Sequence, residues 1–216
     1  MKTILCYGDS NTWGYDPVAS AGAPAAVRHG WRERWTGVMQ TFLGEGYRVV
    51  EEGLNGRTTV HTDPLEEGRN GREYLLPCLL SHKPIDVVVL MVGTNDLKAR
   101  FGLPAGDVAE GAAQLVQLIR RSQAGPTSRA PAVLLVCPPV VTELGHLPQL
   151  EEKFRGAPEK SRRLPPLYEA WAEQLGCGFL NSQKVVNTSL RDGLHLEALE
   201  HGKLGEAMAE AIRKIV

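Results

Sequence analysis

The run Asp-Val-Val-Val-Leu-Met-Val-Gly at residues 86–93 decides the fold class of this chain. A continuous apolar run of this length is typical of a central parallel strand, because such a strand is buried on both faces. Similar runs occupy residues 3–7 and 132–137, and shorter strand signals begin at Arg48 and Gly178. The sequence therefore predicts a central parallel sheet of about five strands.

Helical patterns alternate with these strand signals. Apolar residues recur at helical spacing in four segments, residues 31–44, 108–119, 164–175 and 199–215. Because β-α alternation places helices on both faces of a parallel sheet, we expect a flavodoxin-like, three-layer α/β/α sandwich that forms one domain over residues 1–216. Residues 16–30 and 138–160 are long and irregular, and such loops are more often functional walls than spacers.

Composition limits the class of partner. The 216 residues, 43% hydrophobic and 23% charged, suit a soluble α/β domain with a sizeable core. A net charge of −1 gives no support for binding to nucleic acid or to a membrane surface. The first strand begins at residue 3, which leaves no room for a signal peptide, and no apolar stretch approaches a membrane span. We therefore expect a cytoplasmic protein without nucleic-acid or membrane partners.

The four cysteines fit neither a metal-binding pair nor a disulfide framework. They are Cys6, Cys78, Cys137 and Cys177. Cys6 and Cys137 lie in apolar runs, where cysteine is usually a small buried hydrophobe. A nucleophilic role for Cys137 would need a nearby base, and none is apparent. Carboxylates and histidines show no metal-ligand spacing either, so we expect no metal and no cofactor.

Polar blocks follow the predicted strands. Gly8-Asp9-Ser10 ends the first apolar run, and residues 53–56 and 93–96 follow two others. Asp192-Gly193-Leu194-His195 comes shortly after the last strand. In open parallel sheets ligands bind beyond the carboxyl ends of the strands, so we expect these blocks to meet at one edge.

These blocks contain the parts of a nucleophilic site. His195 is the candidate base for the Ser10 hydroxyl, and Asp192 at a D-x-x-H spacing can hold the inner ring nitrogen. In the alternative, Asp192 caps the last helix and His195 is a surface residue. The other histidines, His29, His61, His82, His146 and His201, are interpreted as surface or loop residues. Of these, His61 and His146 are candidates for a pocket wall.

Taken together, the four blocks resemble those of the SGNH (GDSL-type) hydrolase family. They occur in the same order as in that family and extend over nearly the whole chain. Residues 34–37, 51–54, 57–59 and 93–96 are similar to its bacterial arylesterase/acyltransferase branch. The resemblance implies catalytic Ser10, Asp192 and His195. It also implies an oxyanion hole built from the Ser10 N–H, the Gly56 N–H and the Asn95 side-chain amide, and it implies a homo-oligomer.

Some positions carry a second interpretation. Asn55-Gly56 is also a common turn pair, and the Asn95 amide could bond its own backbone. Asn11 stands where the family name implies leucine, and Asn55 stands where many members have serine. Both touch the expected walls of the site, so Asn11, Asn55 and Trp13 are the candidate substrate-binding residues. A plain packing role for Trp13 is the alternative.

The leading function is a serine carboxylic-ester hydrolase of the arylesterase type. It would take a small-molecule ester with a short acyl chain, form an acyl-enzyme on Ser10, and pass the acyl group to water or an alcohol. One alternative is a carbohydrate acetyl esterase with the same three residues. Another is a non-catalytic, flavodoxin-like binding module in which residues 8–12 cradle a phosphate, although Asp9 would repel that group.

Overall fold

The computed structural model describes residues 1–144 and 147–216, so the interpretation of His146 lies outside the described residues. Five parallel strands form one sheet in the order β2-β1-β3-β4-β5. They are β1 (Lys2–Gly8), β2 (Tyr47–Gly53), β3 (Val87–Met91), β4 (Ala132–Cys137) and β5 (Gly178–Asn181). This is the strand order of flavodoxin-like sheets, and the predicted fold class is confirmed.

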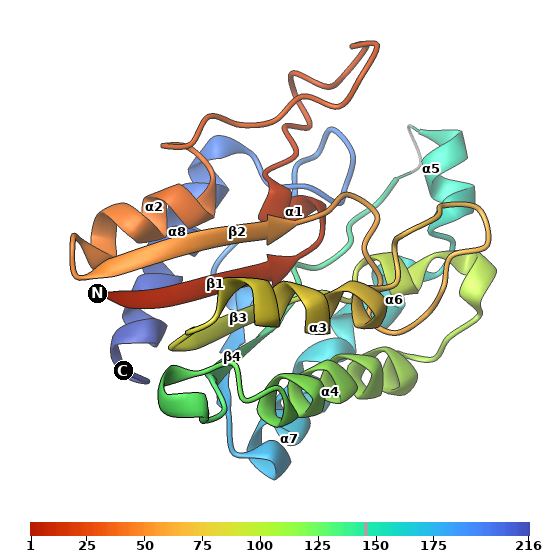
Figure 1. Cartoon of the computed structure of the whole chain (residues 1–216). Coiled ribbons are helices and arrows are strands. Elements are labelled where there is room, and N and C mark those ends of the chain that lie inside the picture. Colours follow the sequence, from red (N-terminus) through yellow and green to blue (C-terminus); the bar gives the residue numbers. More distant parts are fainter. Residues whose placement is uncertain (145–146) are drawn as a thin grey trace.

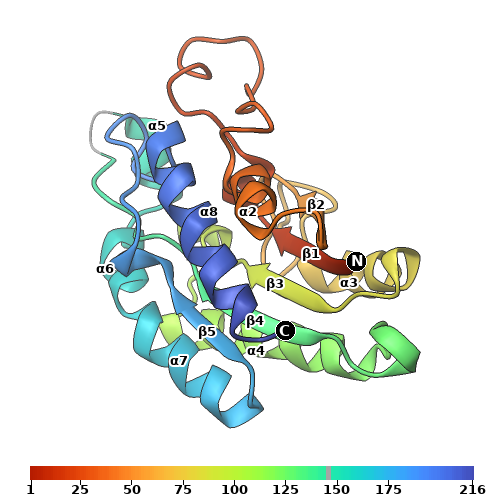
Figure 2. The same cartoon turned by 90° about the vertical axis from the view of Figure 1, so that its left-hand side faces the viewer.

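Helices cover both faces of the sheet (Figures 1 and 2). One face packs against α3 (Gly71–His82), α4 (Ala105–Arg121) and α7 (Leu164–Leu175), and the other against α2 (Trp35–Leu43) and α8 (Ala198–Arg213). Strand side chains alternate between these two cores: Leu5 and Val88 join the first, and Cys6 and Val89 join the second. All five residues of β3 are buried, as expected of a central strand.

Helix α2 is shorter than the sequence predicts, because it begins at Trp35 and not at residue 31. Trp35, Met39 and Leu43 are buried at a spacing of four residues, whereas Trp31 is exposed. The turn before the helix packs closely on Gly37, where a Cβ atom would lie 1.8 Å from the Trp31 carbonyl oxygen. The predicted start of this helix was therefore wrong, since Trp31 belongs to the turn.

Helix α3 has no counterpart among the predicted helices. Its apolar residues point both inward and outward: Leu75 and Leu79 are buried, whereas Leu76 and Leu80 are exposed. Pro77 lies within the same stretch. A helix that is apolar on both sides has no amphipathic stripe, so its periodicity cannot be recognised.

Short helical segments complete the described chain. These are α1 (Ser10–Trp13), α5 (Pro148–Lys153), α6 (Ala157–Arg162) and the 3₁₀ turns η1 (Asn95–Leu97), η2 (Ala99–Phe101), η3 (Pro126–Ser128) and η4 (Ser182–Lys184). Helices α5 and α6 correct the prediction that residues 138–160 are irregular. Among the described residues, no helix is both long enough and apolar enough to cross a membrane.

The carboxyl ends of three strands lie level with one another. Gly8 at the end of β1 is in register with Gly53 of β2 on one side and with Met91 of β3 on the other. The polar blocks that follow these strands therefore begin at the same edge, as predicted. The loop at residues 14–34 and helix α5 lie at the same end of the molecule as α1 (Figure 1).

Candidate active site

Ser10 stands where β1 ends and the short helix α1 begins. The turn is tight, since a Cβ atom on Gly8 would lie 2.0 Å from Thr12 Oγ1. The Asp9 carboxylate caps the helix by accepting a hydrogen bond from the Asn11 N–H at 3.0 Å. Because the first N–H groups of a helix have no acceptor within it, the Ser10 N–H is available at this end.

The structure brings Ser10, His195 and Asp192 into one hydrogen-bonded chain. Ser10 Oγ lies 2.8 Å from His195 Nε2, and His195 Nδ1 lies 2.6 Å from Asp192 Oδ2. Asp192 Oδ1 also accepts the N–H groups of Leu194 and His195, both at 3.0 Å. Burial opposes ionisation of Asp192, but the hydrogen bonds hold its pKa below the usual value. Asp192 does not cap α8, which begins after Glu197.

An aromatic ring that the sequence analysis missed packs on this histidine. Tyr15 stacks on His195 with ring centroids 4.0 Å apart and planes inclined by 28°. Tyr15 directly follows Gly14, whose positive φ of 89° ends α1 in a conformation that favours glycine. The Ser189 N–H also donates to the His195 carbonyl oxygen at 2.7 Å. Nothing local in the sequence links Tyr15 to a histidine so far along the chain.

Gly56 and Asn95 line the same cavity as Ser10, Asp192 and His195. This cavity has a volume of about 370 Å³. Gly56 has a φ of +81°, in the left-handed region that favours glycine. Its N–H has no hydrogen-bond partner among the described residues. Asn95 Nδ2 donates one hydrogen to the Arg57 carbonyl oxygen at 3.1 Å, so the amide keeps its second N–H. Asn95 thus bonds a neighbouring loop and not its own turn.

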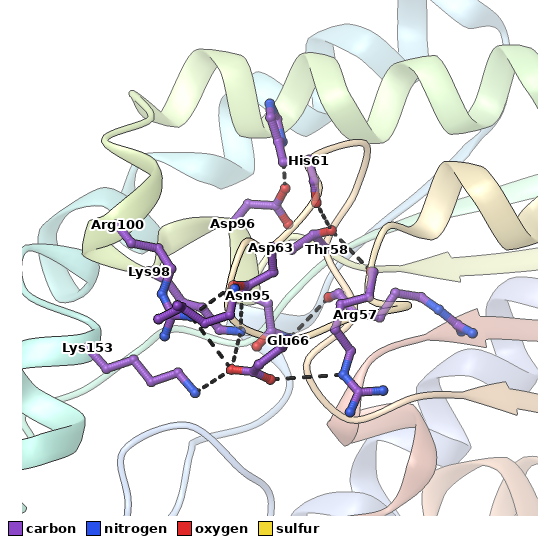
Figure 3. A network of polar contacts seen from close by, with 12 residues as sticks. Arg57, Thr58, His61, Asp63, Glu66, Asn95, Asp96, Lys98, Arg100 and Lys153 are labelled. Carbon is purple, nitrogen blue, oxygen red and sulfur yellow. Dashed lines mark hydrogen bonds and ion pairs between the residues drawn. The ribbon is translucent and has the colours of Figure 1, made fainter.

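The loops that carry Gly56 and Asn95 are tied together by a buried carboxylate (Figure 3). Asp96 accepts the Thr59 N–H at 2.9 Å and the Thr59 hydroxyl at 2.6 Å. His61 Nδ1 lies 2.9 Å from the same carboxylate, and this hydrogen bond raises the pKa of His61. His61 is therefore held by Asp96 and is not among the residues that line the cavity.

The three candidate substrate-binding residues take different positions. Asn55 lines the cavity, whereas Asn11 and Trp13 are not among its lining residues. Asn11 is buried, and its side chain is bonded to the chain on both sides of His195: Nδ2 donates to the Leu194 carbonyl oxygen at 3.1 Å, and Oδ1 accepts the Leu196 N–H at 3.2 Å. Asn11 therefore supports the histidine instead of forming a wall, which corrects the expectation.

Two further histidines are buried: His29 lies in a loop, as expected, whereas His201 lies within α8, which corrects its interpretation as a surface or loop residue. His29 Nε2 lies 3.2 Å from the Leu196 carbonyl oxygen, beside the residue that follows His195. His201 is fully buried within α8 and packs edge-on against His29. Burial lowers the pKa of His201 to about 3, so its ring is neutral at ordinary pH.

One group of side chains among the described residues has metal-type ligands, namely Glu52, Cys78 and His82, whose ligand atoms lie within 4.8 Å of one another. His82 Nε2 and Glu52 Oε1 already lie 2.7 Å apart, within hydrogen-bond distance. Burial raises the pKa of the Cys78 thiol to about 12, which keeps this sulfur protonated. Cys6 and Cys137 are buried as expected, and burial raises the pKa of Cys137 as well.

A serine, a histidine and an aspartate in this geometry, at the carboxyl edge of a flavodoxin-like sheet, are the arrangement of a serine ester hydrolase. Residues 6–201 match the GDSL-like lipase/acylhydrolase family, and the chain belongs to this family. The resemblance to SGNH hydrolases is thereby confirmed, and the protein is a carboxylic ester hydrolase.

Two solved structures that resemble the chain are described as esterases. The chain is 37% identical to Est24, a carbohydrate acetylesterase from Sinorhizobium meliloti, with a TM-score of 0.95. It is 38% identical to the aryl esterase of M. smegmatis, with a TM-score of 0.94. Both matches cover all of both chains. An acetylxylan esterase from Xylanibacter ruminicola is 24% identical over 221 residues, which span 97% of this chain but 43% of that protein.

Proposed function

We propose that this carboxylic ester hydrolase works through an acyl-enzyme on Ser10. The observation that carries the proposal is the hydrogen-bonded chain from Ser10 Oγ through His195 to Asp192. His195 Nε2 removes the hydroxyl proton as Ser10 Oγ bonds to the ester carbonyl carbon, and it then protonates the departing alcohol. Asp192 fixes the ring tautomer and stabilises the imidazolium that forms between these steps.

The proposed oxyanion hole consists of the Ser10 N–H, the Gly56 N–H and the free N–H of the Asn95 amide. All three residues line one cavity. Neither the Ser10 N–H nor the Gly56 N–H has an acceptor among the described residues. Donors that are already oriented stabilise charge on the carbonyl oxygen without reorganising during the reaction.

The proposed substrates are esters with short acyl chains, of the aryl type, and the similarity to the M. smegmatis aryl esterase supports this choice. Acetylated sugars are the second candidate, supported by the relatedness to carbohydrate acetylesterase Est24 and by polar lining residues such as Ser20, Asn55 and Arg69. Family membership argues against the non-catalytic phosphate-binding module considered from the sequence.

Acyl transfer to alcohols is a further part of the proposal. Besides Tyr15, the cavity has apolar lining residues, Pro17, Leu147, Leu150 and Phe154, which disfavour water. When an activated ester acylates Ser10 and releases its leaving group in the presence of a primary alcohol, the acyl-enzyme should pass its acyl group to the alcohol more often than the bulk ratio of alcohol to water allows. A product ratio that merely follows the bulk ratio would identify a plain hydrolase.

A homo-oligomer and a cytoplasmic location also belong to the proposal. Leu147 lines the cavity and is exposed, and three further exposed apolar residues, Val18, Leu65 and Leu190, are each adjacent in sequence to a lining residue. A second copy that covers these residues would bury their apolar surface. Sizing of the native protein by light scattering tests the assembly: a monomeric mass at micromolar concentration would contradict it. Fractionation of the source cells tests the location.

The test of the catalytic proposal is the Ser10→Ala variant with 4-nitrophenyl acetate as substrate. Loss of the nucleophile should abolish turnover, while circular dichroism and the unfolding temperature stay close to the wild-type values. The Ser20→Ala variant is the matched control, since Ser20 lines the same cavity but has no histidine partner. Residual turnover above a few per cent in purified Ser10→Ala would show that Ser10 is not the nucleophile.

A further inference from the structure

One wall of the cavity carries a concentrated group of charges. Glu66, Arg69 and Lys153 line the cavity, and Figure 3 shows the ion pairs that extend from Glu66 behind this wall. Glu66 Oε1 lies 2.8 Å from Lys153 Nζ and 3.1 Å from the buried Lys98 Nζ. Lys98 in turn pairs with Asp63 at 2.9 Å. We call these residues, together with Arg100, the charged wall.

The charged wall has more cations than carboxylates. Arg100 Nη1 lies 2.8 Å from Asp63, so two carboxylates, Asp63 and Glu66, serve four cations, Lys98, Arg100, Lys153 and Arg69. The formal charge of the group is therefore +2. Burial opposes ionisation of both carboxylates, yet the surrounding hydrogen bonds and cations lower the pKa of Glu66 and lower that of Asp63 to about 2. Both carboxylates are therefore held in their charged form by the cations and N–H groups that contact them.

Arg69 has bonding capacity to spare within the cavity wall. Its Nε lies 3.9 Å from Glu66 Oε2, beyond hydrogen-bond distance, and has no hydrogen-bond partner among the described residues. Arg69 also lies directly against Gly56, where a Cβ atom would be 3.2 Å from Arg69 Nε. A guanidinium group in this position borders the place where the ester carbonyl would bind.

We propose that the charged wall selects esters that carry a negative charge, and that Arg69 binds a carboxylate on the alcohol part of the substrate, with Lys153 contributing at longer range. This inference rests on the proposed function, because the short acyl group assigned there leaves the alcohol part to carry the charge. The planar fork of a guanidinium group matches a carboxylate and binds it through paired hydrogen bonds. Glu66 limits the selectivity, since it offsets part of the positive charge.

The experiment compares two acetate esters of nearly equal shape, 4-acetoxybenzoate and its methyl ester, which differ in one negative charge. For each enzyme variant the readout is the ratio of kcat/KM for the anionic ester to kcat/KM for the neutral ester. The ratio within one variant cancels general damage to the catalytic residues. Dividing by the wild-type ratio removes the intrinsic difference in reactivity between the two esters.

Opposite changes at neighbouring positions make the test specific. Arg69→Met should lower the ratio by about 10-fold or more, and Lys153→Met by a few-fold, because each removes a cation from the wall. Glu66→Gln should raise the ratio, because it removes a carboxylate of nearly the same shape. Raising the potassium chloride concentration should lower the wild-type ratio. Arg48→Met is the matched control, since Arg48 is exposed on β2 and does not line the cavity.

The outcomes separate this inference from the proposed function. If wild-type enzyme hydrolyses neither ester, the proposed function fails. If it hydrolyses the neutral ester but Arg69→Met and Glu66→Gln leave the ratio within about 2-fold of wild type, the inference about charge is overturned while the esterase proposal stands. Arg69→Lys is the second variant, in case Arg69→Met does not fold. It keeps the charge without the planar fork, so it should retain only part of the wild-type preference for the anionic ester.

Discussion

Asp96 binds Thr59 through both of its carboxylate oxygens, one to the backbone N–H and the other to the hydroxyl. This pair of hydrogen bonds fixes the segment after Gly56 against the turn that carries Asn95. The Asn95 amide completes the link by donating to the Arg57 carbonyl oxygen. Two of the three proposed oxyanion donors therefore hold each other in place.

The Asp96→Asn variant tests this link. An amide in place of the carboxylate turns an N–H group toward one of the Thr59 donors, so the loop carrying Gly56 should move away from its position. Because preorganised donors act mainly on the transition state, we expect kcat to fall by about 10-fold or more with a small change in KM. Steady-state kinetics with 4-nitrophenyl acetate measures both constants. The exposed Asp107→Asn on α4 is the control, and equal kinetics for the two variants would contradict the link.

The Asn95→Ala variant tests the amide itself. Removing one oxyanion donor typically lowers kcat by about 100-fold, and we expect a loss of that order with KM nearly unchanged. Asn95→Asp is a useful companion, because it retains the size but replaces donors with a negative charge that repels the oxyanion. A change confined to KM would assign Asn95 to substrate positioning.

The sheet could be predicted from the sequence because buried parallel strands leave an unbroken apolar signature. The runs before Gly8 and Gly93 and the run at 132–137 all became strands. Helix α3 could not be predicted, since Leu76 and Leu80 point outward and remove the amphipathic pattern. The start of α2 was displaced because Trp31 continued the helical spacing into a turn.

The reactive residues of the site were visible in the sequence because each lies in a short polar block at a strand end. The residues that support them were not. The stacking of Tyr15 on His195 and the hydrogen bond between Thr59 and Asp96 are contacts between separate loops. The spacing of residues within one segment cannot predict such contacts. For the same reason Asn11, close to Ser10 in sequence, was assigned to a wall, although its amide bonds the loop of His195.

Asn11→Leu should separate this supporting role from substrate contact. The leucine is close in volume but leaves the Leu194 carbonyl and the Leu196 N–H unpaired in a buried position. Each unpaired group costs about 1–3 kcal/mol, so we expect a loss of at least about 2 kcal/mol in the free energy of unfolding. Loss of these hydrogen bonds should also displace His195, and kcat should therefore fall by a similar factor for every ester tested. An altered preference between esters at unchanged stability would restore Asn11 to the substrate-binding wall.

Asp9 gives a prediction about pH and stability. Its carboxyl group is buried beside the nucleophile, and this burial raises its pKa from 3.8 to about 6, although the Asn11 N–H and the nearby His195 act in the opposite direction. The folded chain therefore binds more protons than the unfolded chain between these two values. Stability contributed by Asp9 is present below pH 3.8 and is lost as the pH rises through 6.

Asp9→Asn removes this titration while its side-chain oxygen can still accept the Asn11 N–H. The variant should gain stability relative to wild type as the pH rises from 4 to 7, by up to about 3 kcal/mol for a shift of two pKa units. Urea unfolding of both proteins at a series of pH values measures the difference, and titrations elsewhere cancel in it. The exposed Asp107→Asn variant, measured in the same way, is the control for loss of a carboxylate at the surface. If the Asp9→Asn difference is flat over the same range, the buried carboxyl group does not titrate as inferred.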